Sequence, residues 1–204
     1  MNNIKKEIKE LGVFFKKHIL KCSIIIGVIF IISILSSFLM FRQNQNVASK
    51  IVNEFSSITS SLENLKGLSL SKAIFLNNLR ACVLTVLMGF IPFVYLVFMV
   101  LFPNASLMGA VFSVAKIEKL GKMILFGILP HGIFELPALF ISMALSVYLC
   151  TFITKKIFKK EDKKFMYALK EVFLTFLIIV LPLLILAGII EGVVTPILLT
   201  KFAM

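Results

Sequence analysis

Three ionisable residues, His131, Glu135 and Glu191, stand inside long apolar runs of this sequence. An ionisable side chain at membrane depth is costly, and it usually faces the interior of a helix bundle or a water-filled cavity. His131 and Glu135 are four residues apart, so on a helix they would share one face. Each of the three is therefore a candidate functional residue.

A catalytic metal site needs three protein ligands and an open position. The same three residues could supply these ligands, as one nitrogen and two carboxylates. However, the sequence has no HExxH motif, no second histidine at membrane depth, and no serine or cysteine nucleophile paired with a base. We therefore predict no catalytic residue, no metal and no cofactor, and we interpret His131 and Glu135 as a structural hydrogen bond. An intramembrane metal-dependent hydrolase is kept as an alternative.

Helix-breaking residues frame the pair, because Pro130, Gly132 and Pro137 surround it in the segment "LPHGIFELP". This pattern favours a helix broken around HGIFELP, and the segment "EGVVTP" predicts a second break in the last apolar run. Paired breaks beside polar groups are typical of transporters. A small homo-oligomeric membrane channel or transporter that uses this polar site is thus a further alternative.

The composition indicates that lipid surrounds much of the chain. Apolar residues make up 59 % of it, the mean hydropathy is +1.02, and a water-facing surface does not tolerate such values. The net charge of +12 occurs in loop segments without a nucleic-acid-binding motif, so we expect no nucleic acid as partner. We predict an all-α fold, a polytopic membrane helix bundle.

Charge and run length predict the topology. Residues 22–41, 81–101, 123–153 and 172–199 are long enough to span a bilayer, with a kink at Pro92. The lysine-rich stretches 1–21 and 154–170 should both be cytoplasmic by the positive-inside rule, and this requires an even number of crossings between them. We therefore predict five spans with the N-terminus inside and the C-terminus outside. The third span is either the short run 105–115 or one arm of a fold-back in 123–153.

The predicted organisation is a cytoplasmic basic segment, 1–21, followed by a single membrane domain, 22–204. This domain includes the cytoplasmic basic loop 154–170 and an extracytoplasmic amphipathic segment, 42–80. The latter carries an apolar stripe at helical spacing, which could pack on its own domain, lie on lipid or bind a partner. The stripe comprises Val47, Ile51, Phe55, Ile58, Leu62 and Leu65, and the partner-binding candidates among these are Ile51, Phe55, Ile58 and Leu62.

Four segments, "AIFLNNLRACVLTVLMGFIP", "LMGA", "PHGIFELPA" and "EGVVTP", occur in this order between residues 73 and 196. Together they resemble the stage II sporulation protein M family, and the intramembrane "HGIFELPA" is their most specific piece. The motif positions that the resemblance implies are Asn78, Gly109, His131, Gly132, Glu135, Pro137, Glu191 and Pro196.

The resemblance implies a multi-pass protein of the plasma membrane with a cytoplasmic N-terminus and no catalytic activity of its own. It also implies a role in engulfment of the forespore, in the mother-cell membrane around it. There the chain would anchor stage II sporulation proteins D and P, which degrade septal peptidoglycan outside the membrane. Because the family also occurs in organisms that do not sporulate, a relative with another task is the remaining alternative.

Overall fold

The computed structural model describes residues 2–63, 65, 67–117, 121–161 and 164–202, and every regular element in these residues is a helix. Within this part of the chain, five helices are long and apolar enough to cross a membrane: Lys5–Gln43, Leu68–Met88, Phe98–Lys116, Leu129–Ile157 and Phe165–Phe202. The predicted all-α polytopic bundle with five spans is confirmed, and the chain is a multi-pass membrane protein.

Several spans are built from more than one helical element. Pi-helical turns, labelled η, interrupt the first and last spans without ending them. In chain order the elements are α1 (Asn2–Phe14), η1 (Phe15–Leu20), α2 (Lys21–Gln43), α3 (Gln45–Glu63), α4 (Leu68–Met88), α5 (Phe98–Ile117), α6 (Gly121–Gly127), α7 (Leu129–Ile157), α8 (Phe165–Thr175), η2 (Phe176–Val180), α9 (Leu181–Ile189), η3 (Ile190–Val194) and α10 (Thr195–Phe202).

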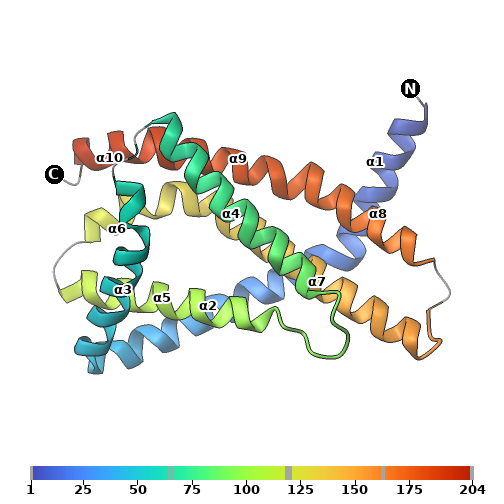
Figure 1. Ribbon diagram of the computed structural model, residues 1–204, viewed down its shortest axis with the longest axis horizontal. Coiled ribbons are helices and arrows are strands. Elements are labelled where there is room, and N and C mark those ends of the chain that lie inside the picture. The colour runs from blue at the N-terminus through green and yellow to red at the C-terminus, as the bar shows by residue number, and fades with distance from the viewer. Residues whose placement is uncertain (1, 64, 66, 118–120, 162–163, 203–204) are drawn as a thin grey trace.

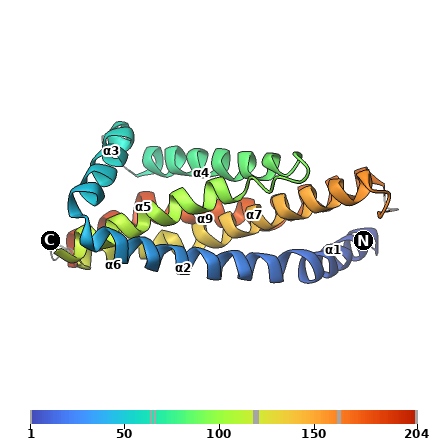
Figure 2. The same cartoon turned by 90° about the horizontal axis from the view of Figure 1, so that it is seen from below.

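The bundle has two distinct ends (Figures 1 and 2). One end, called the basic end here, holds α1, the connection between α4 and α5, and the turn between α7 and α8 (Figure 1). The other, called the α3 end, holds α3, α6 and α10. Both lysine-rich segments of the sequence therefore lie at the same end of the molecule, as the predicted even number of crossings requires.

The boundaries of the second and third spans differ from the prediction. The second span is α4, and it begins at Leu68 and ends at Met88, while residues 89–97 form turns rather than the middle of a helix. Pro92 lies in these turns, because proline lacks the N–H that would continue a helix. Thr154 on α7 accepts a hydrogen bond from the Phe93 N–H at 3.2 Å. The third span, α5, includes 105–115 and is full length, so neither a short span nor a fold-back is needed.

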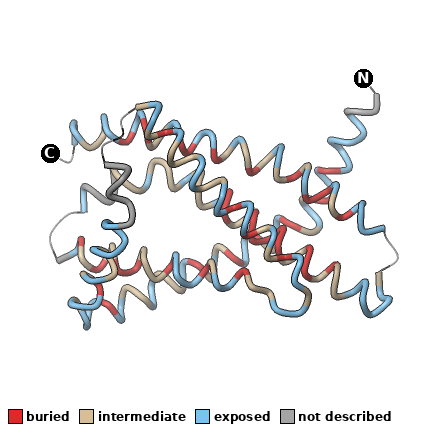
Figure 3. The backbone as a smooth tube through the Cα atoms, in the orientation of Figure 1, coloured by how far each residue is buried: buried red, intermediate tan, exposed pale blue. Residues whose placement is uncertain are grey.

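Helix α7 is the centre of the bundle, and more than half of its apolar window is buried, against a third or less in the other spans. Leu145 and Leu149 on this helix are fully buried, and the buried residues gather where α4 and α7 cross (Figure 3). On the outer span α2, by contrast, Ile24 and Ile31 are each 58 % exposed. Such apolar outer faces fit a helix that contacts lipid.

Glycines allow two helix pairs to approach closely. A Cβ on Gly109 of α5 would lie 2.6 Å from Cβ of Ser37 and 2.9 Å from the Phe38 nitrogen on α2. A Cβ on Gly89 would lie 2.5 Å from the Ser146 carbonyl oxygen on α7. Small residues at such crossings let helix backbones pack against each other in membranes, so Gly109 is a packing residue.

Helix α3 crosses the end of the bundle and packs on α5. Fully buried Ala48 lies with Phe41 and Ala110 in a small cluster of its own, to which Ile51 and Val52 add partly buried side chains. The predicted stripe therefore packs in part on its own membrane domain. Ile58 and Leu62 also belong to the stripe, and their side chains lie outside the part of the chain that the structure describes.

Candidate functional site

The site begins at a break between α6 and α7. Helix α6 ends at Gly127, Ile128 lies outside both helices, and α7 begins at Leu129 with Pro130 in its first turn. Proline is tolerated there because the first N–H groups of a helix need no partner within it. The break lies at Ile128, three residues before HGIFELP, and the motif itself is helical, with Pro137 inside α7.

The second predicted break takes a different form. "EGVVTP" does not interrupt the last span; instead Ile190–Val194 forms η3, one pi-helical turn that continues into α10. Pi-helical turns are rare and frequently occur at functional sites. Glu191 lies in this widened turn.

His131 is the centre of a polar cluster within the membrane-spanning bundle. Its Nδ1 directly contacts Oε2 of Glu191, while its Nε2 lies 3.9 Å from Oε2 of Glu135. The second distance is too long for a hydrogen bond, so the expected hydrogen bond between His131 and Glu135 is absent. All three side chains are largely buried: His131 is 16 % exposed, Glu191 is 24 % exposed and Glu135 is 33 % exposed.

Two further groups complete the cluster. The side chain of Asn78, from α4, lies close enough to the Glu135 carboxyl group to interact with it, and the Gly127 backbone lies similarly close to the His131 ring. Side-chain amides commonly stabilise helix contacts in membranes in this way. Four of the predicted motif residues, Asn78, His131, Glu135 and Glu191, are therefore brought together from α4, α7 and η3.

The other motif positions have separate places. Gly109 lies at the crossing of α2 and α5, and Pro137 and Pro196 are exposed. Gly132 lies beside the cluster, and a Cβ built on it would meet no atom within 4 Å. Gly132 is therefore not required for packing, in contrast to Gly109.

Sequence reasoning missed how the last span packs on α4. A Cβ on Gly192 would lie 2.0 Å from Oγ of Ser71 and 2.7 Å from the Gly67 carbonyl oxygen, and one on Gly188 would lie 3.0 Å from the Ser71 carbonyl oxygen. These two glycines form a GxxxG pattern in an apolar helix, which is a recognised signal for close helix contact. That contact positions Glu191 opposite His131.

Buried polar atoms are concentrated at this junction. Ser71 and Thr195 are 7 % and 3 % exposed, and neither hydroxyl oxygen has a hydrogen-bond partner among the described residues. Buried polar groups are nearly always hydrogen-bonded, so exceptions indicate function or an ordered water. A junction with two carboxyl groups, an imidazole and two hydroxyls can hold water or transfer a proton.

The cluster borders a cavity of about 220 Å³. His131, Glu135 and Asn104 form its polar part, and Phe55 reaches it from α3. Within the part of the chain that the structure describes, no group of three histidine, cysteine or acidic residues is arranged to hold a metal ion. The remaining lining residues are Phe30, Leu107, Met108, Val111, Ile128, Gly132, Leu136 and Leu139.

Comparison with known protein families identifies the family of this chain. The sequence matches the family described as stage II sporulation protein M over residues 25–196. The chain belongs to the stage II sporulation protein M family. The matched range contains every residue of the polar cluster. No curated protein and no solved structure matches the chain significantly.

Membership of the stage II sporulation protein M family makes the chain a sporulation-related membrane protein. This family is not known as a family of enzymes. The polar cluster around His131 and the close helix crossing at Gly109 both lie within the residues that match the family.

Proposed function

We propose that this chain is a membrane scaffold of the forespore engulfment machinery, without catalytic activity of its own. In this proposal it anchors extracytoplasmic peptidoglycan hydrolases, the stage II sporulation proteins D and P, at the septal peptidoglycan. Family membership supports a role in sporulation. The observation that carries the scaffold role is α3, a 19-residue helix attached across one end of the bundle.

The orientation in the proposal follows from charge. The basic end carries the lysines of α1 and of residues 154–170, and positively charged segments stay in the cytoplasm. The α3 end is then extracytoplasmic, on the side of the peptidoglycan, and the N-terminus is cytoplasmic. In a sporulating cell the membrane concerned is the mother-cell membrane around the forespore.

The attachment of α3 suits an anchor. Gln45 Nε2 donates hydrogen bonds to Oγ of Ser113 on α5 at 2.8 Å and to the Phe41 carbonyl oxygen at 2.9 Å. Together with buried Ala48, these contacts fix the start of α3 on the bundle. A partner bound to α3 would be held close to the membrane surface.

The opposite face of α3 is available to a partner. Residues at positions 46, 50, 53 and 54 are exposed, and Val47 is 49 % exposed. Their spacing places them on one side of the helix, away from Ala48. We call Asn46, Val47, Lys50, Asn53 and Glu54 the outer face of α3, and we propose that the hydrolases contact it. Of the predicted partner-binding residues, Ile51 packs on the bundle and half-exposed Phe55 borders the cavity.

The test is a pull-down of the tagged, full-length protein from sporulating cells. We expect Val47→Ser combined with Lys50→Ser and Glu54→Ser to abolish recovery of the hydrolases, with the amount of membrane-inserted protein unchanged. The matched control carries Lys155→Ser, Lys159→Ser and Lys160→Ser at the basic end, and it should recover the hydrolases as the wild type does. Full recovery by the α3 variant would exclude the outer face as the anchor.

A small homo-oligomeric channel or transporter is the second candidate, and the polar cluster beside the 220 Å³ cavity favours it. In that case protons or small cations would pass through the bundle by binding at His131, Glu135 and Glu191. Purified protein in sealed vesicles should then release a proton or potassium gradient, and Glu191→Gln should stop the flux. If the vesicles retained both gradients, a channel or transporter function would be excluded.

A further inference from the structure

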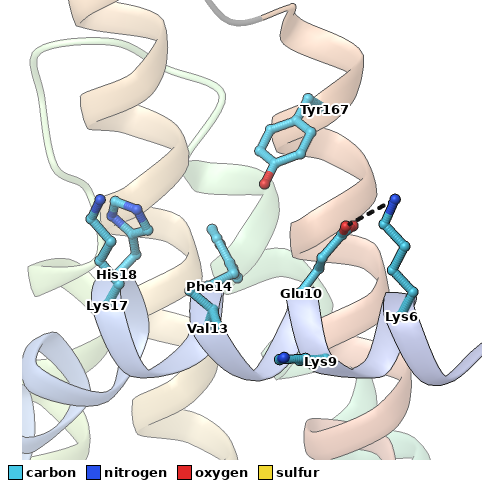
Figure 4. Close-up of a pocket in the computed structure, with 8 residues that line it drawn as sticks. All are labelled: Lys6, Lys9, Glu10, Val13, Phe14, Lys17, His18 and Tyr167. Carbon is cyan, nitrogen blue, oxygen red and sulfur yellow. Dashed lines mark ion pairs between the residues drawn. The ribbon is translucent and has the colours of Figure 1, made fainter.

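A second pocket lies at the basic end, where α1 crosses α8. Its volume is about 460 Å³, within the range of ligand sites in proteins. The lining includes three lysines, one carboxylate, two aromatic groups, an imidazole and a valine. These are Lys6, Lys9, Lys17, Glu10, Phe14, Tyr167, His18 and Val13 (Figure 4).

The pocket combines an apolar floor with a polar rim. Phe14 is 4 % exposed and packs edge-to-face on Tyr148 of α7, with ring centroids 4.9 Å apart. Figure 4 shows the side chains of Lys6, Glu10, Lys17 and His18 on the same side of the first helix as Tyr167, whereas Lys9 lies on the other side. Because Phe14 is fixed by α7, the floor of the pocket is formed before any ligand binds.

The charge of the pocket is positive. Glu10 lies 4.0 Å from Lys6 and offsets its charge, whereas the ammonium groups of Lys9 and Lys17 are in excess. Nearby, Lys170 pairs with Glu7 at 2.6 Å and joins α8 to α1. An anion bound beside Lys17 would receive a charge-assisted hydrogen bond from its ammonium group, and Lys9 would add positive charge nearby.

The depth of the pocket matches the lipid headgroups. The apolar span α2 begins at Lys21 and has 23 residues. At 1.5 Å per residue, its length only slightly exceeds the thickness of the hydrocarbon core. Lys17 lies one helical turn before this start, and η1 widens the helix there. The end of the pocket at Lys17 and His18 thus lies near the boundary between hydrocarbon and headgroups, and the end at Lys6 lies farther from the hydrocarbon.

We propose that this pocket binds the phosphate headgroup of an anionic phospholipid in the leaflet at the basic end. The lysines would bind the phosphate, with Lys17 nearest the hydrocarbon, and the Tyr167 ring would form one wall of the site. Basic pockets between spanning helices bind anionic headgroups in other membrane proteins by the same chemistry.

The experiment is native mass spectrometry of the full-length protein in detergent, titrated with phosphatidylglycerol or with phosphatidylcholine. We expect the wild type to bind phosphatidylglycerol at least ten-fold more tightly. Lys6→Gln, Lys9→Gln and Lys17→Gln together should weaken this binding by roughly a hundred-fold, because each lysine near an anionic surface contributes about five-fold.

The matched control removes the same charge from the same end through Lys155→Gln, Lys159→Gln and Lys160→Gln, and it should bind as the wild type does. An equal loss in this control would mean that general charge attraction is responsible and would overturn the proposal. Equal binding of phosphatidylcholine would also overturn it. So would full displacement of phosphatidylglycerol by an equal concentration of inorganic phosphate, because the site would then prefer a free anion.

Discussion

At the residue scale, the candidate site depends on which carboxyl group His131 contacts. The sequence predicts His131 and Glu135 as a pair, because four-residue spacing puts them on one helix face. In the structure the close partner is Glu191, 60 residues later in the chain, and Asn78 lies beside Glu135 instead. Pattern reasoning finds all four residues but cannot pair them, because the pairing depends on how α4, α7 and the last span pack together.

The contact between His131 and Glu191 should stabilise the bundle, because it joins α7 to η3 within the membrane. We expect His131→Ala and Glu191→Ala each to lower the free energy of unfolding, with a coupling energy of about 1 to 2 kcal/mol in a double-mutant cycle. Unfolding by sodium dodecyl sulfate in detergent micelles gives these values. Strictly additive losses would show that the two side chains do not interact.

The cavity next to this cluster has a lining glycine that packing does not require. Gly132→Ala adds a methyl group where no atom lies within 4 Å, and alanine also favours a helix over glycine. We therefore expect the variant to be as stable as the wild type or up to about 1 kcal/mol more stable. Loss of sporulation in this stable variant would assign a role to the cavity itself.

At the element scale, helix type and number could be predicted from the sequence better than helix boundaries. The five apolar runs predict five spans, but α4 begins 13 residues before the predicted run because Ser69, Ser71 and Lys72 break the apolar pattern of its first turns. The sequence predicts a kink within a helix at Pro92, yet the chain turns there. Tertiary hydrogen bonds from α7 stabilise that turn, and no local pattern signals them.

The packing of the last span on α4 gives a test at this scale. Gly192→Ala would place a methyl group 2.7 Å from the Gly67 carbonyl oxygen, so the backbone would have to move. We expect a loss of about 1 to 3 kcal/mol in the free energy of unfolding, in contrast to the neutral Gly132→Ala. A wild-type stability for Gly192→Ala would contradict the close contact between η3 and α4.

At the scale of the whole molecule, charge and parity predict the orientation, and the two ends of the bundle allow a direct test. Lys50→Cys lies on α3, and Lys160→Cys lies in the turn between α7 and α8. With Cys22, Cys82 and Cys150 replaced, we expect a membrane-impermeant maleimide to label intact cells only through Lys50→Cys. Labelling through Lys160→Cys instead would reverse the orientation and move α3 away from the peptidoglycan.

The two proposed sites lie at opposite ends of the bundle (Figure 1). An anionic lipid at the basic end and a hydrolase on α3 would each bind without the other, because α7 separates them along its length (Figure 1). The lipid-pocket variants should therefore leave hydrolase recovery unchanged, while the α3 variants should leave lipid binding unchanged. Loss of both functions in either variant would indicate coupling through the bundle.

We propose that the hydrolase complex contacts the outer face of α3, and site-specific photocrosslinking during engulfment can detect this contact. A photoreactive residue in place of Lys50 should crosslink to stage II sporulation protein D or P, whereas one in place of Lys160 should not. Crosslinks to these proteins from position 160 alone, or none from position 50 in cells that complete engulfment, would contradict the scaffold proposal.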